Sequence, residues 1–391
     1  MIFICMTYVR VSGRFVAQLS VLTGSDNIGN YNTHAIGRIV VGTGSGFKAH
    51  EVPVLTGNAM KHWHAVYLAR AYESLGGTMI NELCRAGLGL RGYKKDATLS
   101  NLDYADSETE AIKDVCNDLH GFLIAVKKEK KQTNRSKKTE NEEEQTEEET
   151  KKGVQIKRDS LIKFSFAAPV LDTNVLEFVS RFSVVHNRVD PVTQRQQGKK
   201  QSQDQQAEQK TQQMIFKQEY STSPLYGFNV VMDLAYVCKP MYESSSVKIC
   251  DDNEVLRRKE AAILALLYMF TGVGSKQARA LPVSEVVELM AAVSDSPIPN
   301  LVHGSYMDYA EKSLDLLKAY AKSTGKQVYV VCYNVKSCVD QQASAQGQQK
   351  ANPEVKTVNS LEEFFNELLT RLKGQQSSGQ AGGTAQQQGQ Q

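Results

Sequence analysis

Apolar and polar residues alternate along the first part of the chain. Between residues 8 and 22 most of the apolar residues fall on odd positions, a nearly strict period of two that predicts a strand with one buried face. The polar stretch 23–35 that follows is interpreted as a loop. Two apolar segments, 36–42 and 47–55, then flank the tip GTGSG, which predicts a β-hairpin. The chain therefore opens with strands.

A helical period begins at Thr56. Apolar residues recur three and four positions apart, Thr56 can cap the helix, and Gly76 and Gly77 can end it. The second half alternates in the same way between strand-like segments (161–171, 181–187, 225–237 and 327–335) and helices (252–271, one after Ser305, and 360–374). Two capping boxes are predicted, Ser305 with Asp308 and Ser360 with Glu363. Strands followed by helices in this manner predict an α+β fold.

Three segments contain almost nothing that a core could bury. Residues 127–152 are a basic run followed by an acidic run, and we expect a disordered charged insertion there. Residues 194–213 are rich in glutamine, and the tail 375–391 consists mainly of glutamine, glycine and serine. We expect a solvated loop tip and a disordered tail.

Composition narrows the class of protein. Of the 391 residues 41% are hydrophobic, which is typical of a globular chain, and the net charge of +3 gives little support for a nucleic-acid partner. The seven cysteines include no close CxxC pair, so we expect reduced, mostly buried thiols and no bound metal. The opening residues lack a cationic leader, and no run is long enough to span a membrane. We therefore expect a cytoplasmic protein with no membrane partner.

Candidate chemistry is concentrated in a few polar segments. GTGSG lacks the GK[ST] ending of a phosphate-binding P-loop and precedes a strand, which argues against nucleotide binding. The polar loop holds amide, hydroxyl, phenol and imidazole groups suited to RNA, on Asn27, Asn30, Tyr31, Asn32, Thr33 and His34. An ordinary polar loop is the alternative interpretation.

Two further segments carry cations beside polar groups. GVGSKQAR at a helix end could hold a phosphate through Gly272, Gly274, Lys276 and Arg279, although a simple helix C-cap is the alternative. HNRVD could be a harmless turn. His62 and His64 are two positions apart on a helix, which is poor geometry for a shared metal. No catalytic signature is present, so we expect no catalytic residue and no cofactor.

Five segments in order resemble a known family. VSGRFVAQLSVLT with GNYNTH, EVPVLTGNAMKHW, SRFSVVHNRVD, QMIFKQEYSTSPLYGFNVVMDL and FTGVGSKQARALP are similar to the DevR-type backbone subunit of type I CRISPR surveillance complexes, especially the archaeal type I-A form of Cascade. The resemblance implies one domain over 1–391, with a modified RRM-like (ferredoxin-like) core, helices on one side of the sheet, an inserted helical region and a protruding thumb hairpin at 186–219.

The resemblance also implies a function. A non-catalytic subunit of this kind binds guide RNA (crRNA), self-associates along it into a filament, and presents it for pairing with invading target DNA in antiviral defence. Partners would be a small capping subunit and a large subunit. The implied RNA contacts are the loop residues Asn27, Asn30, Tyr31, Asn32, Thr33 and His34, the helix start Asn58, Lys61 and His62, the thumb base His186, Asn187 and Arg188, and the glycine-rich loop Gly272, Gly274, Lys276 and Arg279.

Two alternatives stay open. Asp26 could cleave target RNA with a divalent metal, as a comparable loop does in backbone subunits of type III complexes. The chain could also be a free-standing RNA-binding regulator, which would form a discrete monomer or dimer instead of a filament.

Overall fold

The computed structural model describes residues 7–28, 31–125, 155–188, 214–244, 248–272, 283–344 and 352–374. The chain forms two compact units. The sheet unit contains residues 1–61, 163–235 and 267–391, and the helical unit contains residues 62–162 and 236–266. The predicted insertion at 127–152 and the tail at 375–391 lie outside the described residues, as does the glutamine-rich part of the predicted thumb.

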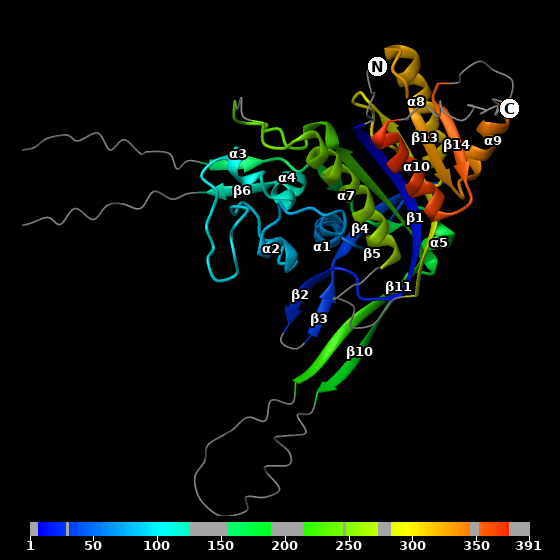
Figure 1. The fold of residues 1–391 in the computed structure, drawn as a ribbon. Coiled ribbons are helices and arrows are strands. Elements are labelled where there is room, and N and C mark those ends of the chain that lie inside the picture. Colours follow the sequence, from blue (N-terminus) through cyan, green and yellow to red (C-terminus); the bar gives the residue numbers. More distant parts are fainter. Residues whose placement is uncertain are drawn as a thin grey trace, which may run out of the picture. The chain divides into compact units, whose positions relative to one another are not determined.

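A sheet of ten strands organises the sheet unit (Figure 1). Its main path runs β14-β13-β12-β1-β11-β3-β2, and β8, β9 and β10 also pair with β11. The strands are β1 (Tyr8–Ser20), β2 (Gly24–Ile28), β3 (Tyr31–His34), β8 (Ile162–Phe164), β9 (Ala168–Pro169), β10 (Ser180–Arg188), β11 (Met214–Asp233), β12 (Val283–Ser294), β13 (Tyr329–Tyr333) and β14 (Glu354–Val358). A separate hairpin consists of β4 (Ile36–Thr43) and β5 (Gly46–Pro53).

Helices cover both faces of this sheet. The helices wholly within the sheet unit are α5 (Thr173–Glu177), α8 (Tyr309–Thr324), α9 (Lys336–Ser344) and α10 (Leu361–Lys373). Even-numbered residues of β12 and β13, such as Met290 and Val330, are buried with α8 and α9. Tyr329, on the other face, donates to Glu367 of α10 at 2.7 Å. The implied arrangement with helices on one side only is therefore wrong, because successive strand residues are apolar on both faces and each face needs a cover.

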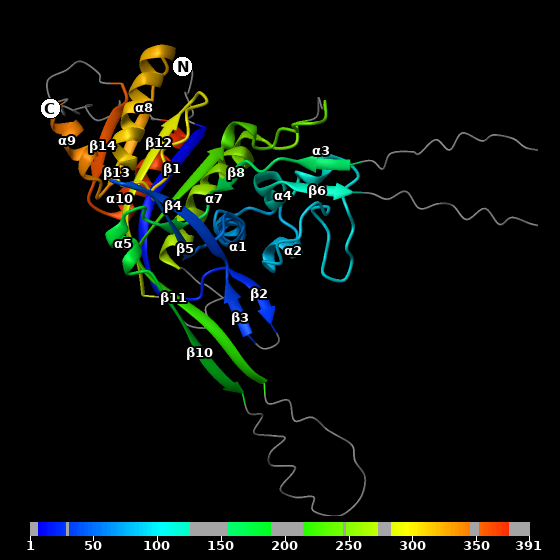
Figure 2. The ribbon, with the colours of Figure 1, turned by 180° about the vertical axis from the view of Figure 1, so that it is seen from behind.

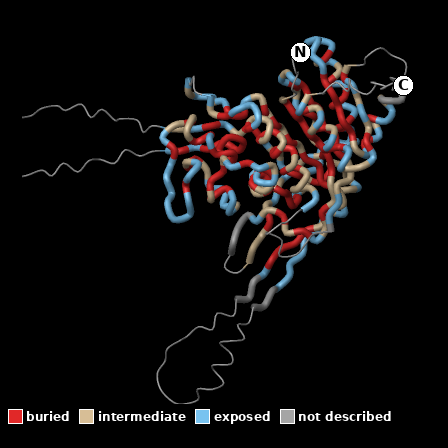
Figure 3. The backbone as a smooth tube through the Cα atoms, viewed as in Figure 1, coloured by how far each residue is buried: buried red, intermediate tan, exposed pale blue. Residues whose placement is uncertain are grey.

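The predicted strand 8–22 is confirmed as β1, but it does not have a single buried face. Its first seven residues are all buried, since β1 lies between β11 and β12 in the middle of the sheet. Close packing on both sides leaves no room for a side chain at Gly13, where a Cβ would lie 2.6 Å from the Glu288 carbonyl oxygen. The hairpin of 36–55 is confirmed, with Thr43 pairing Gly46 across the turn. Figure 3 shows the middle of the sheet as buried; in the β10–β11 hairpin it shows β10 as exposed and much of β11 as buried.

The helical unit has short elements. It contains most of α1 (Gly57–Ser74) and α7 (Asp252–Thr271), with α2 (Glu82–Arg85), α3 (Glu108–Ala111), α4 (Val115–His120), the pair β6 (Phe122–Ala125) and β7 (Gln155–Arg158), and the 3-10 turn η1 (Leu234–Tyr236), which begins in the sheet unit. The predicted helices at Thr56 and at 252–271 are both confirmed. Gly272 follows α7 with a φ of +66°, a conformation that favours glycine.

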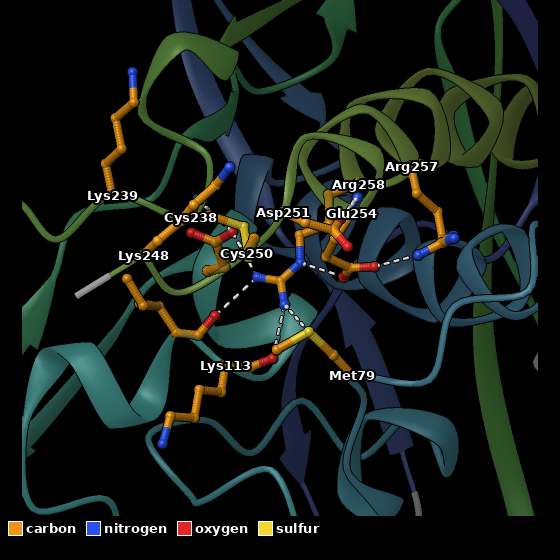
Figure 4. The surroundings of a disulfide bond; sticks show 12 residues. Met79, Lys113, Cys238, Lys239, Lys248, Cys250, Asp251, Glu254, Arg257 and Arg258 are labelled. Carbon is orange, nitrogen blue, oxygen red and sulfur yellow. Dashed lines mark hydrogen bonds and ion pairs between the residues drawn. A yellow bond between two sulfur atoms is a disulfide. The ribbon is translucent and has the colours of Figure 1, made fainter.

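Two arginines organise the interior of the helical unit. Arg258 binds Asp118 and Glu254, both at 2.8 Å, and donates to the backbone carbonyls of Ile112 and Lys113 (Figure 4). Arg158 binds Asp118 at 2.6 Å and Glu108 at 2.9 Å, and donates to the backbone carbonyls of Asp118, Tyr236 and Lys239. Both arginine side chains are fully buried. Their charges are compensated by these carboxylates, as burial requires.

The predicted burial of the cysteines is confirmed for six of the seven residues, but the predicted reduced state is wrong for the same six. Disulfides join Cys84 to Cys116, Cys238 to Cys250, and Cys332 to Cys338. The fold brings each pair together from 32, 12 and 6 residues apart, a proximity that spacing alone does not reveal. Cys5 lies outside the described residues. Figure 4 shows the Cys238–Cys250 bond near Arg258.

The two predicted capping boxes differ in outcome. Ser360 accepts from the backbone N–H of Glu363 at 3.1 Å, as predicted, and the Glu363 carboxylate accepts from the N–H of Asn359. The box at Ser305 is wrong, because α8 begins at Tyr309, after Asp308, whose side chain makes no capping hydrogen bond. Asp308 instead pairs with Lys312 at 2.8 Å. A carboxylate can pair with a lysine four residues later on the same helix, and here this ion pair takes the place of a capping hydrogen bond.

Candidate nucleic-acid interface

The predicted polar loop is a pair of short strands. Residues 24–28 and 31–34 form β2 and β3, which pair antiparallel, and β3 pairs parallel with β11. The loop interpretation was wrong because short polar strands lack the apolar alternation by which strands are found. In Figures 1 and 2 this hairpin lies beside the β10–β11 hairpin.

The register brings three strands into one row. Lys217 of β11 pairs Tyr31 on one side and Val185 of β10 on the other. His186 pairs Phe216, which places its backbone one residue beyond this row. The first strand hairpin and the base of the predicted thumb are therefore neighbours in the sheet unit, although more than 150 residues separate them in sequence.

One face of this row carries an aromatic ring and a cation. The Lys217 Nζ lies 4.5 Å from the centre of the Tyr31 ring, and the Tyr31 hydroxyl is 3.2 Å from the Ser183 hydroxyl. Lys217 is exposed and Tyr31 is half-buried. An accessible ring beside an ammonium group can stack a base and contact its phosphate. The three strands thus form a surface chemically suited to a single-stranded nucleic acid.

Polar contacts tie β3 firmly to β11. Asn32 donates to the Gln218 side chain at 3.2 Å, and the backbone N–H of His34 donates to Glu219 at 2.8 Å. Arg181 of β10 lies 3.5 Å from the same glutamate. The His34 ring is only 2% exposed, and its burial lowers the pKa of the imidazole. Asn32 and Thr33 are half-buried and accessible, whereas an RNA contact by His34 would require the hairpin to move.

The start of α1 lies beside the start of this hairpin. Thr23, just before β2, accepts the Thr56 backbone N–H at 2.9 Å, and Thr56 accepts the N–H of Ala59 at 3.3 Å as the predicted cap. Gly57 lies so near the Phe164 carbonyl oxygen that a Cβ would come within 2.4 Å of it. Asn58 is exposed and Lys61 half-buried. A helix start with an exposed amide and a nearby lysine suits an anion.

The two histidines of α1 have different surroundings. His64 is fully buried, with its ring nitrogens 3.0 Å from His120 Nε2 and 2.9 Å from the Ala262 carbonyl oxygen. Its burial lowers the pKa to about 4. His62 is half-buried, and burial followed by the charge of Arg91 lowers its pKa. Only His62 of this pair is accessible for binding.

Several predicted contacts cannot be placed. Asn30, Gly274, Lys276 and Arg279 lie outside the described residues. The backbones of Asp26 and Asn27 lie in β2, and those of His186, Asn187 and Arg188 lie in β10, but their side chains are not described. These assignments stay predictions.

The sequence also held a residue that prediction missed. Lys217 lies within QMIFKQEY, a segment that contributed to the family resemblance but in which no individual contact was identified. The signal that the sequence offered was a polar triplet, Lys217 to Glu219, between the aromatic residues Phe216 and Tyr220. The pairing of β11 with β3, which places Lys217 opposite Tyr31, is what identifies this lysine as a candidate contact.

The described residues hold neither a metal cluster nor a membrane-spanning helix. No group of three or more His, Cys, Asp or Glu side chains there could hold a metal ion. None of the helices in the described part of the chain is both long and apolar enough to cross a membrane.

Fold and interface together define an α+β protein with a central sheet and an aromatic, cationic surface on adjoining strands. A family model described as CRISPR-associated negative auto-regulator DevR/Csa2 matches residues 11–314. The chain belongs to this family of CRISPR-associated proteins.

Named relatives agree with this membership. Proteins called CRISPR-associated protein Cas7/Cst2/DevR are 48% identical over 93% of this chain and 95% of the relative in Thermoproteus tenax, and 32% identical over 84% and 93% in Methanocaldococcus jannaschii. The CRISPR-associated aCascade subunit Cas7/Csa2 2 of Saccharolobus solfataricus is 25% identical over 78% of this chain and 84% of that one. A chain of a solved CRISPR RNA-guided surveillance complex, pre-nicking, is 12% identical with a TM-score of 0.43, covering 94% of this chain and all of that one.

Proposed function

We propose that this protein is a non-catalytic backbone subunit of a type I CRISPR surveillance complex. Several copies would assemble along one guide RNA and present it for pairing with target DNA. The observation that carries the proposal is family membership, since relatives named Cas7 align with nearly the whole chain. A small capping subunit and a large subunit are the proposed partners, and the cytoplasm is the proposed location.

The β3–β11–β10 row supports RNA as the ligand. Single-stranded RNA is bound by stacking on aromatic rings and by cations on its phosphates, without the need to recognise sequence. Tyr31, Lys217 and Ser183 provide these groups side by side, and Asn32, Asn58 and Lys61 extend them as proposed contacts. We also propose that the central antiparallel strands are an RRM-like core and that residues 186–219 form the thumb.

Bound nucleic acid gives the first test. The full chain would be expressed with its guide array, purified, and its RNA extracted for sequencing and length analysis. Guide-length RNA of uniform size is expected, and particle size should increase with guide length if copies form a filament. Protein that carries no RNA and also fails to bind added guide RNA would refute the proposal, whereas binding without growth in size would favour a free-standing regulator.

A lysine pair tests the interface itself. Lys217→Ala removes the cation beside Tyr31 and should weaken guide binding while reducing the salt dependence by about one phosphate contact. Lys318→Ala removes a lysine of similar charge from α8 and should leave binding unchanged. Equal affinities for the two variants would exclude the row from the interface.

A cleavage assay separates this proposal from metal-dependent RNA cleavage. Target RNA bound to the assembled complex would be incubated with Mg²⁺, using the natural chain and Asp26→Ala. We expect intact RNA in both. Regularly spaced cuts that disappear in Asp26→Ala would assign an enzymatic function to that residue.

A further inference from the structure

A glycine-rich loop closes over α1 within the helical unit. Gly87, Gly89 and Gly92 have φ values of +69°, +71° and +88°, which side chains rarely adopt. A Cβ on Gly89 would lie 3.0 Å from His62 Nδ1, and one on Gly87 would lie 3.2 Å from a methyl carbon of Val66. These glycines allow the loop to approach the helix closely.

The loop and the helix enclose a hollow. It is lined by His62, Ala65, Val66, Gly87, Gly89, Leu90, Arg91 and the Cys84–Cys116 disulfide, and it is a small depression that is partly open to solvent. Two of its lining side chains, His62 and Arg91, can donate hydrogen bonds through ring or guanidinium nitrogens. The rest of the wall is apolar or glycine.

Arg91 contributes a positively charged guanidinium group to the wall of the hollow. Among the described residues no carboxylate lies within ion-pair distance of its guanidinium group. Asp114, the acidic group that influences it, already accepts the backbone N–H groups of Asn81 at 2.7 Å and Asn117 at 2.9 Å. Burial lowers the pKa of Arg91 to about 10, because partial removal from water disfavours the charged guanidinium group. A bound anion would offset this desolvation.

Backbone donors add to this charge. The N–H groups of Gly87, Leu88 and Gly92 donate to Cys84, Leu83 and Asn117. Those of the three residues between them, Gly89, Leu90 and Arg91, have no acceptor among the described residues. Gly89 and Leu90 are exposed, so their N–H groups are open to solvent and available to an anion held by the adjacent Arg91.

We propose that the hollow between loop 87–92 and α1 binds one phosphate group, with Arg91 as the principal ligand and His62 as a second donor. The guanidinium fork matches two oxygens of a phosphate, and the N–H groups of the loop can donate hydrogen bonds to a third. The phosphate could come from a nucleic-acid backbone or from free phosphate, and the chemistry of the site is the same. Only the nucleic-acid source rests on the function proposed above.

His62 reports on occupancy in the natural protein. An anion beside the imidazole stabilises its protonated form and would therefore raise its pKa, counteracting the Arg91 charge. The full chain would be labelled with ¹³C-histidine, the His62 signal assigned among the seven histidines by His62→Gln, and inorganic phosphate added at constant ionic strength against chloride. A saturable His62 shift is expected. No shift with phosphate or with a single-stranded oligonucleotide would overturn the proposal without affecting the guide-RNA function.

Three arginine variants test the ligand. Arg91→Gln should weaken phosphate binding about tenfold or more, and Arg91→Lys should weaken it less because one charge remains without the fork. Arg85→Gln is the matched control: this arginine lies six residues away, is exposed and pairs with Glu73, so no change is expected. Equal loss in Arg85→Gln and Arg91→Gln would overturn the site. If Arg91→Gln does not fold, the titration of the natural chain still decides.

Matched probes identify the source. A short oligonucleotide that shifts His62 at lower concentration than phosphate, while its uncharged methylphosphonate form does not, would assign the site to a nucleic-acid backbone. Equal potency of oligonucleotide and phosphate, counted per phosphate group, would assign it to free phosphate. A shift with polyglutamate but not with either phosphate probe would overturn the proposal in favour of an acidic peptide.

Discussion

The sheet unit and the helical unit provide hydrogen-bond partners for their backbone groups in different ways. In the sheet unit, backbone groups pair between neighbouring strands, and the core around α8, β12 and β13 is almost entirely apolar. The helical unit has short elements, and buried arginines bind its loop carbonyls: Arg158 reaches three and Arg258 two. A guanidinium group has five donors, so one side chain can serve several carbonyls that no strand or helix satisfies.

The two interiors differ in how much stability one substitution removes. Burial disfavours the charge of Arg258, but Asp118 and Glu254 outweigh it and raise the pKa of the guanidinium group. Removing one arginine leaves its buried carboxylate partners with one cation fewer, whereas removing one apolar side chain leaves only a cavity. The helical unit should therefore be more vulnerable to single changes than the sheet unit.

The largest effect is expected at Arg258. Arg258→Met should destabilise the helical unit by about 3–5 kcal/mol, because Asp118 and Glu254 lose a partner. Arg257→Met is the control at the preceding position of α7, where the side chain is 31% exposed, pairs with Glu254 and donates to the backbone carbonyl of Leu75, but is not paired with Asp118. Denaturant unfolding with hydrogen exchange at residues 105–125 would measure both. Comparable losses would show that the buried network has no special role.

A smaller loss is expected in the apolar core. Leu317 of α8 is fully buried against β12 and β13, and Leu317→Ala should cost about 2–4 kcal/mol through lost contacts and a cavity. The hydrogen exchange of β13 should accelerate while that of α4 stays unchanged. A loss of protection at α4 of equal size would mean that the two units unfold together.

Two buried titratable groups of the helical unit, His64 and Asp114, should change the folding stability in opposite directions as the pH changes. Burial lowers the His64 pKa to about 4, so its contribution to stability is full above about pH 6.5 and declines as the pH falls toward 4. Burial raises the Asp114 pKa to about 6, so its contribution is full below about pH 3.8 and is lost as the pH rises through 6. Between pH 4 and 6 the two slopes nearly cancel.

Separate substitutions should reveal these slopes. As the pH falls from 6 to 4, His64→Gln should gain stability relative to the natural chain, and Asp114→Asn should lose it, each by about 1.4 kcal/mol per pH unit. His120 and Arg91 face the same region and are unchanged in both variants. Unfolding curves across this range would measure the slopes, and parallel profiles for all three proteins would contradict the assignment.

The smallest effect is expected at a helix cap. Ser360→Ala removes the acceptor of the Glu363 backbone N–H at the start of α10 and should cost about 1 kcal/mol. Asp308→Ala at α8 removes no cap hydrogen bond and should change the thermal midpoint less. An equal decrease in both midpoints would remove the distinction between the two helix starts.

The local sequence pattern predicted those strands, helices and caps that depend on residues close together in the sequence. The strand at Tyr8, the helix after Thr56 and the capped helix after Ser360 all follow from periodicity and caps. The β2–β3 hairpin was missed because its polar strands are held by pairing with β11, which begins about 180 residues later. The disulfides, the arginine network and the partnership of Lys217 with Tyr31 likewise depend on distant segments, and a charged residue in a helix sequence suggests a solvated face.

The helical unit is made from two separate stretches of chain, 62–162 and 236–266. Arg258 therefore leaves the ribosome 100 residues after Arg158. At about 5–20 residues per second, Asp118 spends on the order of 5–20 s with Arg158 synthesised but its second partner, Arg258, still missing. Nascent chains of this protein should expose an incomplete acidic cluster during that interval, and a translation pause after residue 162 would prolong it.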